Sequence, residues 1–193
     1  MSLPRLVCIL GAECTGKTAL AQALALHFGS IWVPEYLRSF CDLQQRTPKQ
    51  HEQAHILQTQ LEWQQQALQQ ASQKGLQHVF CDTAALQTAA YSDYYFSDKS
   101  LYPLARAAHA GYALTLLLAA DLPWVADGRQ RDGSQAQAAM HALLATELAG
   151  LVDPVRLAHI SGSGPARLQA GIEAVAAMLG QPLAHNTGVD AAA

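Results

Sequence analysis

Residues 5–28, R-L-V-C-I-L-G-A-E-C-T-G-K-T-A-L-A-Q-A-L-A-L-H-F, decide the fold of this chain. The apolar run Arg5–Leu10 has the length of a buried strand, and the Ala- and Leu-rich Thr18–Phe28 predicts a helix. Between them, Gly11–Thr18 matches the phosphate-binding pattern G-x-x-x-x-G-K-S/T at every position. This pattern arises by chance in roughly one chain of this length in a hundred. The strand before the motif and the helix after it therefore decide in favour of a phosphate-binding loop.

The residue types of this loop suit the phosphates of ATP. Gly11 and Gly16 permit a backbone turn that aims successive N–H groups at an anion, next to a helix N-terminus. Lys17 places a positive charge against the β and γ phosphates, and the Thr18 hydroxyl suits Mg²⁺, which prefers oxygen ligands. The expected nucleotide contacts come from Gly11, Ala12, Glu13, Cys14, Thr15, Gly16, Lys17, Thr18 and Ala19.

Strands and helices alternate along the rest of the chain. Further strands are expected at Ile31–Val33, His78–Cys81, Tyr112–Ala120 and Val155–Ile160, and further helices at Glu52–Gln73, Thr83–Tyr95, Leu101–Ala110, Ser134–Ala149 and Pro165–Leu179. This order predicts an α/β fold of three layers, a parallel five-stranded sheet with helices on both faces. We expect one domain over residues 1–181 and a flexible tail over 182–193.

Composition narrows the class of protein. Half of the 193 residues are apolar, only 14% are charged, and the formal net charge is −3. This balance gives no overall attraction to nucleic acid or to an anionic membrane. The cysteines form no C-x-x-C pair, no signal peptide is expected, and Cys8 and Cys81 lie in apolar runs that suit the core. We therefore expect a cytoplasmic protein.

Two carboxylates follow predicted strands. Because ligands of open α/β sheets bind beyond the carboxyl ends of the strands, Asp82 and Glu35 are candidate site residues. We assign Asp82 chiefly to Mg²⁺ and its water, and Glu35 chiefly to an acceptor hydroxyl. Asp82 has an alternative role as a helix N-cap. Arg38 either meets an anionic group or forms a surface ion pair with Glu35.

A segment rich in Gly and Arg follows the most apolar strand. Residues 121–135 run D-L-P-W-V-A-D-G-R-Q-R-D-G-S-Q. Arg129 or Arg131 would neutralise charge on a phosphoryl group in transfer, and the glycines would let the segment close as a lid. The alternative is an ordinary solvated loop. The predicted catalytic residues are thus Lys17, Asp82, Glu35 and Arg129, and Arg129 and Arg131 also belong to the predicted nucleotide site.

Residues 51–55, H-E-Q-A-H, match the zinc-hydrolase pattern H-E-x-x-H. Nothing downstream has a convincing signature for the third zinc ligand. The polar residues around the motif indicate the exposed start of a helix instead.

Taken together, the motifs resemble the NadR-type ribosylnicotinamide kinase family of P-loop proteins. The resemblance rests on G-A-E-C-T-G-K-T-A-L, W-V-P-E-Y-L-R-S-F, F-C-D-T followed by Gln87 and Thr88, and L-P-W-V-A-D-G-R-Q-R-D-G-S-Q. It implies a nucleoside-kinase-like fold with a lid, and ATP-dependent phosphorylation of the 5′-hydroxyl of nicotinamide riboside to nicotinamide mononucleotide. It also implies roles for Lys17 and Thr18 at ATP and Mg²⁺, for Asp82 at the metal and acceptor, for Glu35, Tyr36 and Arg38 on the acceptor side, and for Trp124, Asp127 and Arg129 in the lid.

The chain departs from some members of that family, which carry a fused adenylyltransferase domain and a DNA-binding domain. It has no H-x-G-H signature, so a stand-alone kinase is expected, with another protein adenylylating its product. Two other functions stay open: a kinase for another nucleoside or small alcohol, and an ATPase switch without a small acceptor. A GTPase would need N-K-x-D, which the sequence lacks. The acceptor base depends on pocket shape, so the sequence leaves it open, as it does the oligomeric state.

Overall fold

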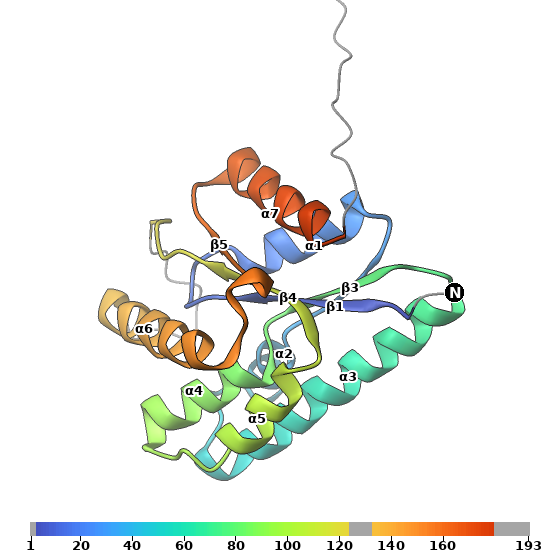
Figure 1. The fold of residues 1–193 in the computed structure, drawn as a ribbon. Coiled ribbons are helices and arrows are strands. Elements are labelled where there is room, and N and C mark those ends of the chain that lie inside the picture. The colour runs from blue at the N-terminus through green and yellow to red at the C-terminus, as the bar shows by residue number, and fades with distance from the viewer. Residues whose placement is uncertain (1–2, 124–132, 180–193) are drawn as a thin grey trace, which may run out of the picture.

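The computed structural model describes residues 3–123 and 133–179, and within them a five-stranded sheet forms the centre of the fold (Figure 1). Its strands are β1 (Arg5–Leu10), β2 (Ile31–Val33), β3 (His78–Asp82), β4 (Tyr112–Leu118) and β5 (Leu157–Ile160). They lie in the order β2-β3-β1-β4-β5, and every pairing is parallel. The predicted three-layer α/β fold is confirmed.

Helices cover both faces of the sheet, as parallel strands require. Helices α1 (Lys17–His27) and α7 (Gly164–Leu179) lie on one face (Figure 1). The other face carries α2 (Tyr36–Gln44), α3 (Gln53–Gln73), α4 (Ala85–Phe96), α5 (Tyr102–His109) and α6 (Gly133–Leu151). Two short 3-10 helices, Gln50–Glu52 and Pro154–Arg156, precede α3 and β5.

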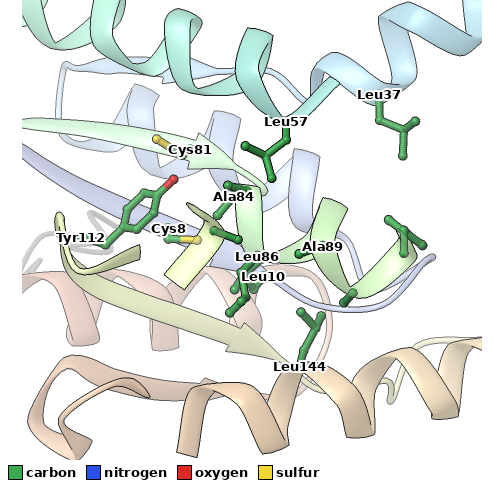
Figure 2. Packing of buried hydrophobic residues seen from close by; sticks show 14 of the residues in the cluster. Cys8, Leu10, Leu37, Leu57, Cys81, Ala84, Leu86, Ala89, Tyr112 and Leu144 are labelled. Carbon is green, nitrogen blue, oxygen red and sulfur yellow. The ribbon is translucent and has the colours of Figure 1, made fainter. Parts of the chain in front are cut away.

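Alternate residues of β1 divide the core into two halves. Val7 and Ile9 pack with residues of α1 and α7, whereas Cys8 and Leu10 pack with helices of the opposite face. Figure 2 shows Leu57, Leu86 and Leu144, from α3, α4 and α6, around Cys8 and Leu10. Cys8 and Cys81 are buried neighbours across β1 and β3, so the prediction that they are core residues is confirmed. Burial raises the pKa of both thiols, which makes them unreactive.

Close packing joins the two helices of the first face. A Cβ added to Gly171 of α7 would lie 3.2 Å from Leu20 Cδ1 and 3.4 Å from Leu24 Cδ2, both on α1. This is tighter than ordinary van der Waals contact, so α7 approaches α1 at a distance that suits glycine.

The structure also contains a helix that the sequence analysis did not assign. Helix α2 begins directly after Glu35, and its buried residues Leu37, Phe40 and Cys41 recur at helical spacing. Three buried residues in nine make a weak periodic signal. Three strand boundaries differ as well: β3 includes Asp82, one residue past the expected Cys81, β4 ends at Leu118, before the expected Ala120, and β5 begins at Leu157. The later start of β5 follows from the 3-10 turn, where Val155 N donates a 3.0 Å hydrogen bond to Asp153 Oδ1.

The expected tail, residues 182–193, lies outside the described residues. Among the helices that are described, none combines the length and apolarity needed to cross a membrane.

Two leucines of α1 provide a matched test of the core. Leu24 is 0% exposed, while Leu26 on the same helix is 85% exposed. Leu24→Ala should lower the free energy of unfolding by about 2–5 kcal/mol, because it removes buried methyl groups and leaves a cavity. Leu26→Ala should change it by less than about 0.5 kcal/mol. Urea unfolding of both variants checks this, and equal effects would contradict the described packing of α1.

Candidate nucleotide and acceptor site

The candidate residues meet at the carboxyl ends of three adjacent strands. β3 lies between β1 and β2, with Asp82 opposite Ile9 and Val33 opposite Cys81. The phosphate loop follows β1, Asp82 ends β3, and Glu35 lies just beyond β2. This is the neighbourhood that the assignments of Asp82 and Glu35 require.

The phosphate loop has a constrained backbone. Gly16 has φ +81° and Cys14 has φ +56°, so both adopt the left-handed conformation. A Cβ at Gly11 would lie 2.7 Å from Thr15 Oγ1 and 3.1 Å from Leu118 Cβ, which leaves no room for a side chain. The Ala12 carbonyl accepts hydrogen bonds from Thr15 Oγ1 (2.8 Å) and Lys17 Nζ (2.9 Å). The loop therefore holds the Lys17 ammonium against its own backbone.

Asp82 contacts the helix that follows this loop. Thr18 Oγ1 donates a 2.6 Å hydrogen bond to Asp82 Oδ2. Asp82 is 1% exposed, and burial raises its pKa, although the Thr18 hydrogen bond and the charges of Lys17 and Arg38 oppose that shift. Among the described residues, its buried Oδ1 finds no hydrogen-bond partner. A hydroxyl and a carboxylate side by side, one oxygen still without a partner, are the hard donors that fit Mg²⁺.

The turn after Asp82 is strained. Thr83 is β-branched yet has φ +78°, and its N–H donates a 3.0 Å hydrogen bond to the Ile9 carbonyl. Helix α4 begins at Ala85, and its N-cap is Ala84, without a side-chain cap. The alternative role of Asp82 as the N-cap of this helix is thus wrong: its carboxylate faces Thr18.

Glu35 is a buried carboxylate. It is 8% exposed, and burial raises its pKa, while Lys17 lowers it and Asp82 raises it further. Arg38 is exposed and has a smaller lowering effect on the pKa. Glu35 occupies the N-cap position of α2 but makes no side-chain cap. Glu35 is thus buried rather than on the surface, and whether Arg38 pairs with it or meets an anionic group stays a prediction.

Gln60 of α3 fixes the backbone on both sides of Glu35. Its Oε1 accepts a 2.7 Å hydrogen bond from Tyr36 N, and its Nε2 donates a 3.2 Å hydrogen bond to the Pro34 carbonyl. The Tyr36 ring packs edge-on against Trp63 at 5.0 Å between centroids. The sequence analysis missed Gln60, whose signal is a glutamine between Leu57 and Leu61 on the buried side of α3.

Helix α4 contributes a further buried pair to this region. Gln87 Nε2 donates a 3.4 Å hydrogen bond to Tyr91 Oη, and Gln87 Oε1 has no partner among the described residues. The pKa of Tyr91 is raised well above its usual value, first by burial and then by the negative charges of Glu35 and Glu13. Tyr91 therefore shares its surroundings with Glu35, a proximity that the sequence analysis did not predict.

The H-E-Q-A-H segment forms an ordinary helix start. Glu52 accepts hydrogen bonds from Arg46 at 2.7 and 2.6 Å and from Lys49 N at 2.7 Å. These bonds, led by that with Arg46, lower the pKa of Glu52 to about 2, so it is a poor general base. His55 lies 3.3 Å from Tyr36 Oη. Across residues 3–123 and 133–179, no group of three His, Cys, Asp or Glu residues is arranged to hold a metal ion.

The predicted lid residues Trp124, Asp127, Arg129 and Arg131 lie outside the described residues, so their roles stay predictions. Two later side chains, also missed from the sequence, do contact the phosphate loop. Gln137 Nε2 donates a 2.7 Å hydrogen bond to the Glu13 carbonyl, and Arg167 Nη1 donates to the Thr15 carbonyl.

The raised pKa of Glu35 has a consequence for stability. A carboxyl group whose pKa is higher in the folded than in the unfolded state destabilises the fold once pH exceeds its unfolded pKa, since its buried charge is unfavourable. Glu35→Gln should therefore raise the melting temperature at pH 8, and its advantage should shrink as pH falls through the raised pKa of Glu35 and then below the unfolded value. Thermal melts at pH 8 and pH 4 measure this. Glu62→Gln, at an exposed position on α3, is the control, and a Glu35→Gln protein less stable than wild type at pH 8 would contradict the assignment.

Solved structures with this fold include nucleoside and nucleotide kinases. NadR in complex with NR superposes with a TM-score of 0.82 at 22% identity, over 96% of this chain and 54% of the NadR chain. NadR in complex with NAD and AMP-PNP gives 0.75 at 22% identity, over 99% and 52% of the two chains. Thymidylate kinase from Ehrlichia chaffeensis gives 0.60 at 14% identity, over 92% and 100%. The chain thus spans about half the length of the NadR chains.

A comparison with curated protein sequences gave no significant match. The family model described as an AAA domain, by contrast, matches residues 6–167, from β1 through the phosphate loop to the first turn of α7. The chain therefore belongs to the AAA domain family of P-loop proteins, and it has the fold that NadR and thymidylate kinase share.

Proposed function

We propose that this protein is an ATP-dependent kinase that phosphorylates the 5′-hydroxyl of nicotinamide riboside to give nicotinamide mononucleotide. The observation that carries the proposal is the pair of buried carboxylates beside the phosphate loop, Asp82 at the end of β3 and Glu35 just beyond the adjacent β2. The likeness to NadR in complex with NR extends over 96% of this chain and supports the choice of acceptor.

ATP would bind with its phosphates in the loop. The loop N–H groups and Lys17 bind the β and γ phosphates, and Lys17 leaves the Ala12 carbonyl to reach them. The Thr18 hydroxyl and Asp82 would hold Mg²⁺, which neutralises phosphate charge during transfer. In this arrangement the residues supply mainly positioning and charge stabilisation.

Glu35 would receive the acceptor. Burial raises its pKa, so its carboxylate takes up a proton more readily than an exposed one does. The 5′-hydroxyl donates a hydrogen bond to Glu35 and its oxygen attacks the γ-phosphorus. The bond from that phosphorus to ADP breaks, and the hydroxyl proton passes to Glu35. Tyr36, Arg38 and the Gln87–Tyr91 pair would line this acceptor side.

A second candidate acceptor is another nucleoside or nucleotide. Thymidylate kinase, with a TM-score of 0.60, and deoxyadenosine kinase from M. mycoides, with 0.54, share the fold. A panel containing nicotinamide riboside, thymidine, thymidine monophosphate and deoxyadenosine, with ATP consumption and product mass measured, separates the two candidates. Consumption without any phosphorylated acceptor would favour an ATPase switch.

Substitution of the three central side chains should have separable effects. Lys17→Ala should lose nearly all turnover while keeping its fold, because the ammonium stabilises charge on the γ-phosphoryl group. Asp82→Asn should slow the chemical step and change the Mg²⁺ dependence. Glu35→Gln should lower kcat/KM for nicotinamide riboside by about one to two decades, the value of a hydrogen bond to a charged group, with ATP binding nearly normal.

Steady-state kinetics with the nucleoside varied at saturating ATP measure these effects. Arg46→Met, which breaks the ion pair with Glu52 away from the phosphate loop, is the control and should retain wild-type kinetics. If Glu35→Gln leaves nucleoside efficiency unchanged, the acceptor site is misplaced. If Lys17→Ala keeps wild-type turnover, the phosphate loop is not the catalytic site.

A further inference from the structure

We propose that Arg167 and Gln137 are positioning residues, which act from outside the sequence motif to orient the N–H groups of the phosphate loop. The proposal rests on the proposed function only in that it takes this loop to bind the phosphates of ATP. The two side chains come from α7 and α6, and they lie 152 and 124 residues from the loop carbonyls that they contact.

Arg167 joins the loops that follow three strands. Its side chain is 5% exposed and donates to the carbonyl of Thr15, after β1, and to that of Ala119 (3.4 Å), after β4. It also donates to the carbonyl of Gly162 (2.7 Å), after β5. The guanidinium pairs with Asp121, which in turn accepts a 2.7 Å hydrogen bond from Gly162 N. A buried cation with these partners is rigid, because every contact restricts the same planar group.

Gln137 makes an equivalent contact from the other side of the sheet. Its side chain is buried, and its Nε2 donates a 2.7 Å hydrogen bond to the Glu13 carbonyl. The Ala12 carbonyl is already held by Thr15 Oγ1 and Lys17 Nζ. Three carbonyls of the loop, at residues 12, 13 and 15, therefore accept side-chain hydrogen bonds, and the Ala12 carbonyl would keep that from Thr15 when Lys17 moves to the phosphates.

Peptide geometry turns these carbonyl contacts into control of the phosphate donors. A peptide group is planar and trans, so its N–H points opposite to its carbonyl. Holding the Thr15 carbonyl outward aims the Gly16 N–H inward, and holding the Glu13 carbonyl does the same for Cys14 N–H. Cys14 and Gly16 are the loop residues with positive φ, where the backbone most needs outside support. The guanidinium charge also polarises the Thr15–Gly16 peptide and strengthens its N–H as a donor.

The test measures phosphate binding separately from catalysis. Calorimetry with inorganic tripolyphosphate, which carries phosphates but no adenosine, reports on the loop, and calorimetry with AMP-PNP and Mg²⁺ reports on the whole nucleotide. Arg167→Met should weaken the binding of both ligands about ten- to hundredfold, which corresponds to the loss of a charged hydrogen bond. Gln137→Met should weaken it about three- to tenfold, which corresponds to the loss of a neutral one. In kinase assays the KM for ATP should rise by similar factors, while the KM for the nucleoside changes less than about twofold. Arg167→Lys, which keeps the charge but not the fork, should recover part of the loss.

The matched control is Arg106→Met. Arg106 on α5 also forms a two-bond ion pair, to Glu147 of α6 at 2.9 and 3.0 Å, without contacting the loop. It should leave tripolyphosphate binding unchanged. If the Arg167 variants do not fold, as circular dichroism would show, Gln137→Met decides the matter.

Folded Arg167→Met and Gln137→Met proteins that bind tripolyphosphate like wild type would overturn the proposal, even with a lowered melting temperature. Failure of the proposed function is distinguishable. If no nucleoside is phosphorylated but the variants still lose tripolyphosphate affinity, the positioning role stands and the acceptor assignment falls. A wild-type protein that binds neither ligand would overturn both.

Discussion

The hydrogen bond between Thr18 and Asp82 is the contact on which the rest of the site depends. It joins the start of α1 to the end of β3, and so connects the phosphate loop to the strand beside it. The parallel pairing of β1 with β3 and of β3 with β2 then brings Glu35 into the same charged region. Burial raises the pKa of both Asp82 and Glu35, the charge of Asp82 raises that of Glu35 further, and the charge of Lys17 lowers both. The site gains basic carboxylates at the expense of stability, a common trade-off at functional sites.

Sequence alone predicted the fold because its signals are local. A buried strand, a phosphate loop and a helix in direct succession specify the first βα unit, and short apolar runs between helices specify the remaining strands. Helix α2 was not predicted because only three of its residues, Leu37, Phe40 and Cys41, are buried, and so its apolar periodicity is weak. Asp82 and Glu35 could be proposed as neighbours since strand ends in a parallel sheet lie along one edge.

The supporting contacts could not be predicted in the same way. Gln60, Gln137 and Arg167 lie in helices outside the recognised motifs. Their partners are backbone carbonyls or an amide far along the chain. Every residue has a backbone carbonyl, whatever its side chain. The sequence therefore does not mark residue 13 or 15 as the partner of a distant side chain. Only the three-dimensional arrangement shows that α6 and α7 reach the loop.

The close approach of α7 to α1 gives one more consequence. Gly171 lies one helical turn after Arg167. Because it has no side chain, Leu20 and Leu24 of α1 can pack directly against it, and this sets the distance between α7 and α1. A larger residue there would move the base from which Arg167 extends, although residue 171 contacts neither the loop nor Asp121. In a library of variants, few residue types would then be tolerated at position 171. Some of the variants that fail would still fold but would use nucleotide poorly. Selection for nucleotide use would thus reach a glycine on the side of α7 that faces another helix.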